Sequence, residues 1–166
     1  MHELARAEKR PSDTAFEPGN HVTASGVKRG ILANVPSRLT FPLLIPRRST
    51  FRAVVALAEP ASGGVRFRVG MSDDRRFEPL SQITLDATAD GGRSAELSAD
   101  LSAYAGWKWS VFYQPDRWIW RLVLSTDALS AVPTQAIWSE PRIEARVADA
   151  HEYTRRVMAR RARERQ

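Results

Sequence analysis

The centre of the chain is built from short runs in which apolar and polar residues alternate. In Val65–Val69 the three apolar residues share one face of an extended strand, while Arg66 and Arg68 share the other. Turn-forming residues separate these runs, and no helical period intervenes between them. The expected strands are 37–41, 51–57, 65–69, 83–86, 94–101, 107–113, 118–125 and 135–138. About eight strands in this arrangement indicate an all-β fold, an antiparallel β-sandwich or jelly roll.

The pattern changes at both ends of this β-region, which spans residues 27–143. From Val147 onward, apolar residues recur every three or four positions without an intervening Gly or Pro, which predicts a C-terminal α-helix within 144–166. Prolines and a Gly-Asn pair break the N-terminal residues into pieces too short for a regular element. Residues 1–26 are therefore expected to form an extended arm that becomes ordered only against another surface.

The positive charge of the chain is concentrated in the predicted helix. The protein carries a formal net charge of +6, and its last residues hold six arginines against the single acid Glu164. This segment carries five of the six net charges, so residues 1–154 together carry a net charge of only +1. A basic helix favours an acidic protein subunit or an anionic lipid surface as partner. The candidate binding residues are Arg155, Arg156, Arg160 and Arg161.

Two other interpretations of the basic segment stay open. It could be a solvated, frayed tail with no partner. It could also bind nucleic acid, although Glu144, Asp149 and Glu152 interleave with the arginines and weaken a purely phosphate-binding interpretation.

Four of the five tryptophans lie within residues 107–120. Strand spacing puts Trp107, Trp109 and Tyr113 on one face, and Trp118 and Trp120 on one face of a returning strand. Pro-Asp at positions 115 and 116 suits the turn between them. The rings either fill the core of the sandwich or form a surface that docks a protein, a lipid face or a sugar. The second interpretation makes these five aromatic residues candidate partner-binding residues.

The sequence lacks the motifs of the common enzyme classes. It has no Cys, and its three histidines, His2, His21 and His151, are far apart. No nucleophile–His–Asp order, phosphate-binding Gly loop or HExxH helix is present. Asn34 stands where a sulfatase would need Cys or Ser ahead of x-Pro-x-Arg. A non-enzymatic protein without a cofactor is therefore expected.

The chain also lacks signals that would place it in or across a membrane. It has no run of about 18 apolar residues and no apolar stretch after its charged N-terminus. We therefore expect a cytoplasmic protein, or one bound to the periphery of a membrane.

An ordered series of short motifs resembles a known domain type. The series is 36–41 (PSRLTF), 67–73 (FRVGMSD), 100–106 (DLSAYAG), 121–126 (RLVLST) and 138–143 (WSEPRI). It is similar to the galactose-binding-like jelly-roll domains found beside catalytic domains in bacterial sulfatase-like and glycan-active proteins. The resemblance implies a non-catalytic sandwich of the carbohydrate-binding-module type, sometimes with a structural calcium ion. Asp residues near turns, at 73, 74, 86, 90 and 100, could hold such an ion, although Asp more often forms turns.

These observations lead to one main expectation about function and two alternatives. The main one is an accessory subunit that docks onto a larger protein assembly, or at a membrane surface, through the Trp-rich hairpin and the Arg-rich helix. The alternatives are a carbohydrate-binding module, in which the Trp rings stack on sugars, and a nucleic-acid-binding protein.

Overall fold

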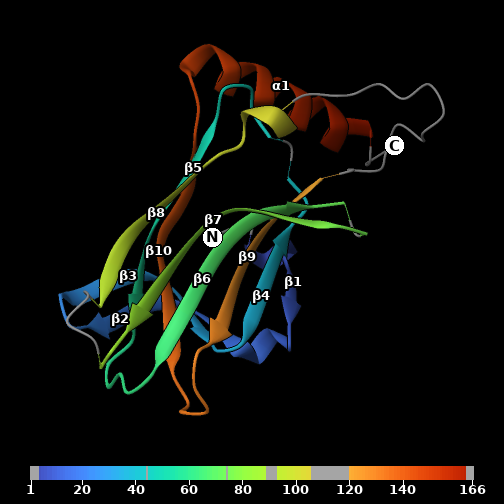
Figure 1. The fold of residues 1–166 in the computed structure, drawn as a ribbon. Coiled ribbons are helices and arrows are strands. Elements are labelled where there is room, and N and C mark those ends of the chain that lie inside the picture. Colours follow the sequence, from blue (N-terminus) through green and yellow to red (C-terminus); the bar gives the residue numbers. More distant parts are fainter. Residues whose placement is uncertain (1–3, 44, 74, 89–92, 106–119, 164–166) are drawn as a thin grey trace.

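The computed structural model describes residues 4–43, 45–73, 75–88, 93–105 and 120–163. Within these residues, ten strands form two five-stranded antiparallel sheets that pack face to face, with one C-terminal helix (Figure 1). We call the sheet with strand order β1-β4-β9-β6-β7 sheet A, and the sheet with order β2-β3-β10-β5-β8 sheet B. The predicted fold class, an all-β sandwich with a C-terminal helix, is confirmed.

The strands are β1 Glu8–Arg10, β2 Phe16–Thr23, β3 Gly26–Asn34, β4 Ser37–Phe41, β5 Thr50–Leu57, β6 Gly64–Ser72, β7 Phe77–Asp86, β8 Ser94–Asp100, β9 Arg121–Ala128 and β10 Gln135–Glu144. The helices are the 3-10 turns η1 Leu4–Arg6, η2 Asp13–Ala15 and η3 Ser102–Tyr104, and α1 Val147–Arg163.

The core lies between the two sheets and follows the alternation in the sequence. Val65, Phe67 and Val69 on β6 are fully buried, whereas Arg66 is exposed. Trp138 on β10 is 1% exposed and meets Phe67 edge to face, with ring centroids 5.3 Å apart. Among the described residues, this tryptophan is the largest fully buried side chain.

The N-terminal residues belong to both sheets rather than forming an arm. β1 pairs with β4 at one edge of sheet A, η2 follows, and β2 pairs with β3 along its whole length at the edge of sheet B. Pro18 and Gly19 are tolerated in β2 because an edge strand has one side that needs no partner. Ala15 and Phe16 are buried, so the segment between the sheets also contributes to the core.

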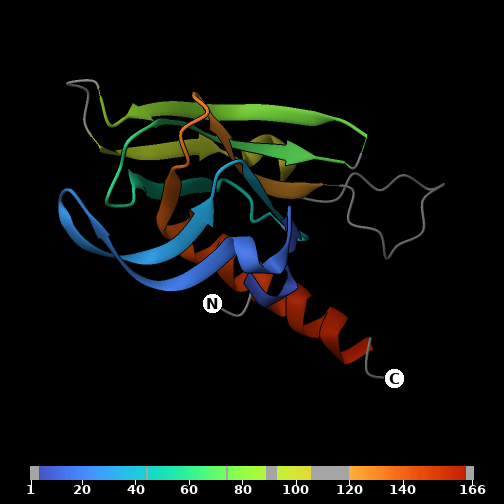
Figure 2. The same ribbon diagram turned by 90° about the horizontal axis from the view of Figure 1, so that it is seen from below.

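Helix α1 lies across the end of the sandwich where β10 ends and β5 begins (Figures 1 and 2). β10 continues to Glu144, and the helix starts at Val147. No helix in the described part of the chain is both long and apolar enough to cross a membrane.

We expect Trp138→Ala to lower the free energy of unfolding by about 3–5 kcal/mol, because it leaves a large cavity between the sheets. Trp138→Phe should cost less, since an aromatic ring still meets Phe67. Val132→Ala, at a side chain 44% exposed, is the control and should change stability by less than about 0.5 kcal/mol. Urea denaturation measures all three. Equal effects of Trp138→Ala and Val132→Ala would contradict the assigned core.

Candidate functional site

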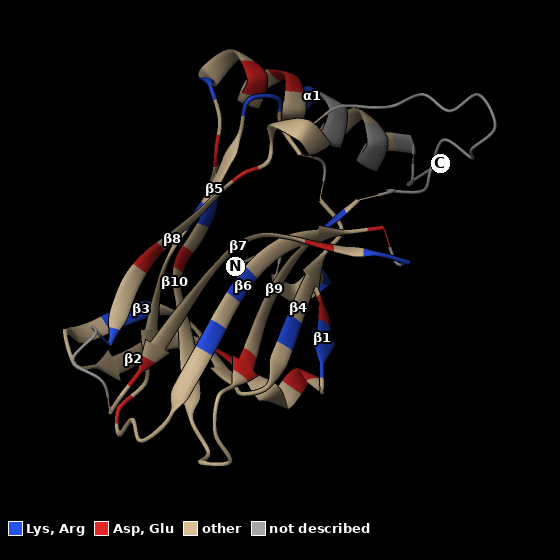
Figure 3. Ribbon diagram, viewed as in Figure 1, with Lys and Arg blue, Asp and Glu red and all other residues tan. Residues whose placement is uncertain are grey.

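A row of polar side chains crosses the outer face of sheet A. Strand register places Arg10 opposite Arg38, Arg38 opposite Ser125, Ser125 opposite Arg68, and Arg68 opposite Gln82. Directly paired residues point to the same side of a sheet. Since the neighbouring residues Leu39, Leu124 and Val69 are buried in the core, this row faces outward. We call these five residues the arginine row; Figure 3 shows basic residues on β1, β4 and β6 in the same sheet.

The ring of Phe77, at the start of β7, lies beside this row and packs directly on Gly70. A Cβ atom built at Gly70 would lie 2.6 and 2.7 Å from two carbons of that ring, and it would also clash with the carbonyl oxygen of Glu78. The sequence thus provides a glycine where the ring must approach the strand closely. The Cζ atoms of Arg38 and Arg68 lie 5.4 and 5.9 Å from the ring centroid, within cation–π range. Phe77 is a half-buried aromatic platform between two guanidinium groups.

Four residues of the arginine row and Phe77 border a shallow depression of about 350 Å³; the four are Arg10, Arg38, Arg68 and Ser125. Its remaining lining residues are Pro11, Pro36, Ser37, Val123, Thr126 and Asp127. Polar groups beside an aromatic surface in a depression are the usual composition of a small ligand site.

The charges of this face are only partly compensated. Asp127 pairs with Arg68 at 2.6 Å, and Glu8 pairs with Arg10 at 2.6 Å and with Arg121 at 3.6 Å. Arg38 has no acidic partner among the described residues.

Two polar atoms of the row also lack protein partners. Ser125 Oγ and Arg68 Nε are buried and have no hydrogen-bond partner among the described residues. Buried polar groups are nearly always hydrogen-bonded, so each exception requires an explanation. A bound ligand that carries acceptor atoms would be such an explanation.

Of the five predicted aromatic binding residues, only Trp120 lies in the described part of the chain. It is half-buried, packs against the core, and meets Tyr104 edge to face at 5.0 Å. Burial, together with a hydrogen bond to Glu78, raises the pKa of Tyr104 to about 12. Trp120 therefore has a packing role. Trp107, Trp109, Tyr113 and Trp118 lie outside the described residues.

The described ends of the Trp-rich segment meet beside the Phe77 platform. The contact of Tyr104 with Trp120 holds the chain before residue 106 close to the chain after residue 119. The next residue, Arg121, pairs with Ser72, which in turn pairs with Phe77. The described residues on either side of positions 106–119 thus lie close to the aromatic part of sheet A.

The first turns of α1 are fastened to the sandwich. Arg48 donates two hydrogen bonds to the carboxylate of Asp149, at 3.0 and 2.9 Å, and Asp149 is only 6% exposed. The hydrogen bonds from Arg48 lower the pKa of Asp149, and the nearby charges of Arg146 and Arg47 lower it further.

The same turns cover an apolar cavity of about 870 Å³ between the two sheets. Ala150, Tyr153 and Thr154 line it from the helix, and Ile31, Phe51 and Leu124 are among the residues that line it from the sheets. Val147, expected on the apolar face of the helix, is instead 71% exposed.

The second half of α1 has the basic residues predicted to bind a partner. Arg155 is exposed, and so is Met158, at 61%. Arg156, Arg160 and Arg161 lie on the helix, but their side chains are outside the described set. The structure therefore shows an anchored first half of the helix and places the arginines in the half that follows.

Three of the Asp residues considered for calcium form turns, and the other two, Asp74 and Asp90, lie outside the described residues. Asp73 accepts hydrogen bonds from the backbone of Arg75 and Arg76, Asp86 from Thr88, and Asp100 from Ser102. These hydrogen bonds lower the pKa of each carboxyl. Among the described residues, no three side chains of His, Cys, Asp or Glu cluster as metal ligands would.

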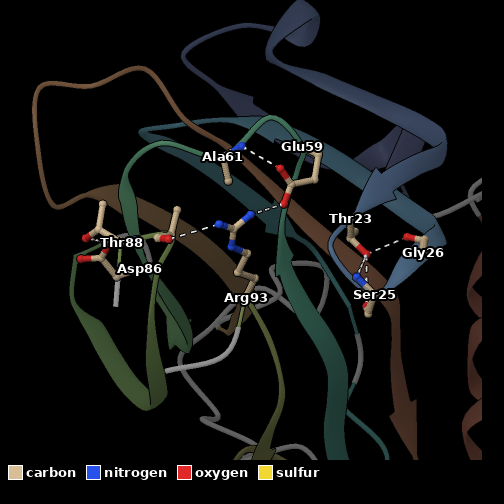
Figure 4. A network of polar contacts seen from close by, with 9 residues as sticks. Thr23, Ser25, Gly26, Glu59, Ala61, Asp86, Thr88 and Arg93 are labelled. Atoms are coloured by element: carbon tan, nitrogen blue, oxygen red, sulfur yellow. Dashed lines mark hydrogen bonds and ion pairs between the residues drawn. The ribbon is translucent and has the colours of Figure 1, made fainter. Parts of the chain in front are cut away.

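The positively charged side chain of Arg93 lies in the polar cluster near Asp86 (Figure 4). The guanidinium of Arg93 donates to Glu59 at 2.7 Å and to the carbonyl oxygen of Ala87 at 3.4 Å. Arg93 thus links the start of β8 to the loop after β5 and to the end of β7.

The two described histidines lie on different elements. Nε2 of His21, on β2, is 3.0 Å from the carbonyl oxygen of Glu17, and His151 is exposed on α1. His2 lies outside the described residues.

No protein-family model and no curated protein matches the sequence. Solved structures match the fold. The cleaved adhesin domain of Lys-gingipain from Porphyromonas gingivalis is 16% identical with a TM-score of 0.53, and the match covers 85% of this chain and 91% of that one.

Further matches include carbohydrate-binding modules. The CBM51-2 and INT domains of ZmpB from Clostridium perfringens are 13% identical, with a TM-score of 0.48, covering 81% of this chain and 27% of that one. The CBM22-1–GH10 modules of Clostridium thermocellum xylanase 10B, complexed with xylohexaose, are 12% identical, with a TM-score of 0.49, covering 87% and 27%. This chain therefore spans little more than a quarter of those proteins. The β-sandwich expected from the sequence is confirmed by the two sheets of this chain and by the match to the adhesin domain, and such a match shows the fold alone.

The anchoring of α1 should depend on pH. The pKa of Asp149 is lower in the folded protein, so its pairing with Arg48 stabilises the fold above the ordinary Asp pKa and is lost as the pH falls below about 4. We expect amide NMR signals of Arg48 and of the first turn of α1 to move together in that range. Asp149→Asn should remove this change. Asp13→Asn, which removes an exposed pair with Lys9, is the control, and an unaltered titration in Asp149→Asn would refute the anchor.

Proposed function

We propose that the protein is a non-catalytic carbohydrate-binding module and that its ligand lies on the outer face of sheet A. The observation that carries the proposal is the Phe77 platform, held down on Gly70 and flanked by the guanidinium groups of Arg38 and Arg68.

The chemistry of this face suits a sugar. The C–H-rich face of a pyranose ring packs on an aromatic ring, while its hydroxyl groups need donors and acceptors in the surrounding plane. Arg38, Arg68 and Ser125 supply donors, and Asp127 supplies an acceptor, all within the depression that Phe77 borders. A sheet face with polar groups across five strands offers contacts along an extended oligosaccharide.

The Trp-rich segment is proposed to contribute to the same binding. The support for this is that the described residues flanking the segment lie near Phe77: Tyr104 contacts Trp120, and the next residue, Arg121, is joined to Phe77 through Ser72. The residues proposed to contribute are Trp107, Trp109, Tyr113 and Trp118. Trp fluorescence should then change when glycan is added to the wild-type protein. The same change in a variant with Trp107, Trp109 and Trp118 replaced by Phe would contradict this role.

Loss of the platform should weaken glycan binding. We expect Phe77→Ala to reduce the affinity for a bound polysaccharide about tenfold, because an aromatic contact contributes about 1 kcal/mol beyond its buried area. Gly70→Ala should have a similar effect with Phe77 still present, since the new Cβ displaces the ring. Calorimetric titration with a panel of soluble polysaccharides measures both.

The matched control is Val27→Ala, which shortens a side chain 67% exposed on sheet B. It should leave the affinity unchanged, and thermal melting of all three variants reports on their folding. The proposal is wrong if no polysaccharide binds the wild-type protein, or if Phe77→Ala and Val27→Ala bind equally well.

We also propose a second function, docking to a larger protein assembly through the end of α1. The anchored first turns and the exposed Arg155 and Met158 favour it, because a fixed base holds the basic end of the helix in one direction. The anionic surface of a membrane is the alternative partner for the same arginines.

A truncation separates this docking from the stability of the sandwich. A chain that ends at Thr154 keeps Asp149 and Tyr153 and loses every arginine from 155 onward. It should melt close to the full-length temperature but recover fewer partner proteins, identified by mass spectrometry after co-purification from the native source. A chain that ends at Arg146 uncovers the cavity and should melt at a lower temperature. Equal recovery with the full-length chain and the chain ending at Thr154 would refute docking through this segment.

A further inference from the structure

The geometry points to an acidic glycan as the ligand of sheet A, with a sugar carboxylate or sulfate bound over Ser125 between Arg38 and Arg68. This inference rests on the proposed carbohydrate-binding function and adds the charge of the ligand and the position of that charge.

The local charge balance is the first step. The count covers the arginine row and the outward-facing positions two residues before and after it on each strand. The arginines at these positions are Arg10, Arg38, Arg66 and Arg68, and the acids are Glu8 and Asp127. Both acids already form ion pairs with arginines of this face. The face therefore has an excess of positive charge at its centre, which a neutral sugar would leave uncompensated and an anionic sugar would neutralise.

The positions of the unused donors are the second step. Ser125 lies on the middle strand, β9, with Arg38 and Arg68 directly opposite it on the two neighbouring strands. Strands are about 4.8 Å apart, so the two arginines start about 10 Å from each other with Ser125 midway. Arg38 has no acidic partner in the described chain, and Ser125 Oγ and Arg68 Nε have no hydrogen-bond partner there. An oxyanion above Ser125 would lie between the guanidinium groups of Arg38 and Arg68, and guanidinium groups match carboxylate and sulfate oxygens well. To bond Ser125 Oγ and Arg68 Nε as well, it has to displace the side chains that cover these two atoms.

The third step concerns the Phe77 platform, which fixes how far the anionic group of the ligand lies from the sugar ring that packs on Phe77. Both guanidinium groups lie within 6 Å of the Phe77 centroid, so an oxyanion between them stands next to the ring that packs on Phe77. A uronic acid or a sulfated sugar has this arrangement, because its carboxylate or sulfate is attached to a pyranose ring with a flat apolar face. A nucleic acid also joins a ring to an anion, so it is included in the test below.

The experiment is an NMR titration of the full-length protein, in which the amides of sheet A are followed separately from those of α1. The probes are glucose, glucuronate, glucose 6-sulfate, inorganic sulfate and a short single-stranded oligonucleotide. We expect glucuronate or glucose 6-sulfate to shift the amides of Ser125, Arg68 and Phe77, with an affinity at least tenfold higher than that of glucose. Comparison of these two sugars separates carboxylate from sulfate recognition.

Arg38→Gln should reduce the affinity for the acidic sugar at least tenfold. Arg66→Gln is the matched control, because it removes the same charge from an exposed position two residues along β6, outside the row. It should change the affinity less than twofold. Equal losses in the two variants would show attraction by overall charge and would overturn the assigned position.

The remaining outcomes separate this inference from the proposed function. If glucose binds as tightly as glucuronate and Arg38→Gln has no effect, the acidic ligand is ruled out while glycan binding stands. If inorganic sulfate shifts Ser125 but no sugar does, the anion site stands and glycan binding fails. Tighter binding of the oligonucleotide than of either acidic sugar would overturn both in favour of nucleic acid.

Discussion

The position of β9 between β4 and β6 is the constraint on which the proposed site depends. Leu124 pairs with Leu39 on one side and with Val69 on the other, and all three are buried between the sheets. Because side chains alternate along a strand, burying these three residues forces their neighbours Arg38, Arg68 and Ser125 outward and onto one line. A shift of one residue in this register would place arginines in the core, so the hydrophobic effect that holds the sandwich together also fixes the arrangement of the charges.

The outer face of sheet A departs from the rules that the rest of the fold follows. Like charges on neighbouring strands are unfavourable, and buried polar atoms without partners cost free energy. Salt bridges from Asp127 and Glu8 and the ring of Phe77 offset part of this cost, but Ser125 Oγ and Arg68 Nε stay without hydrogen-bond partners in the described chain. Local departures from packing and polar satisfaction concentrate where proteins bind ligands.

The local pattern of the sequence was enough for the β-class, for strands such as β4 and β6, and for the C-terminal helix. It failed at β2, where Pro18 and Gly19 look like a break but occupy an edge strand. The arginine row could not have been found in this way. Arg10, Arg38, Arg68 and Ser125 are distant in sequence, and only the strand order β1-β4-β9-β6-β7 brings them into one line. The one local signal was Gly70 between strand residues, which indicates a close approach without saying what approaches.

The distribution of charge explains why the sequence directed attention to α1 first. Residues 1–154 together carry a net charge of only +1, and the excess positive charge lies in the last residues. A sandwich, however, separates residues that are adjacent in sequence onto opposite faces. Glu96 and Glu144 pair with Arg52 on sheet B, and Glu59 pairs with Arg93 near the ends of the strands, so these acids do not neutralise sheet A. The small sum over residues 1–154 thus conceals a basic face, and the protein has two basic regions of different character. The one on sheet A is held rigidly around an aromatic ring, which suits selection of a ligand by shape. The one on α1 follows an anchored turn, which suits attachment to a partner.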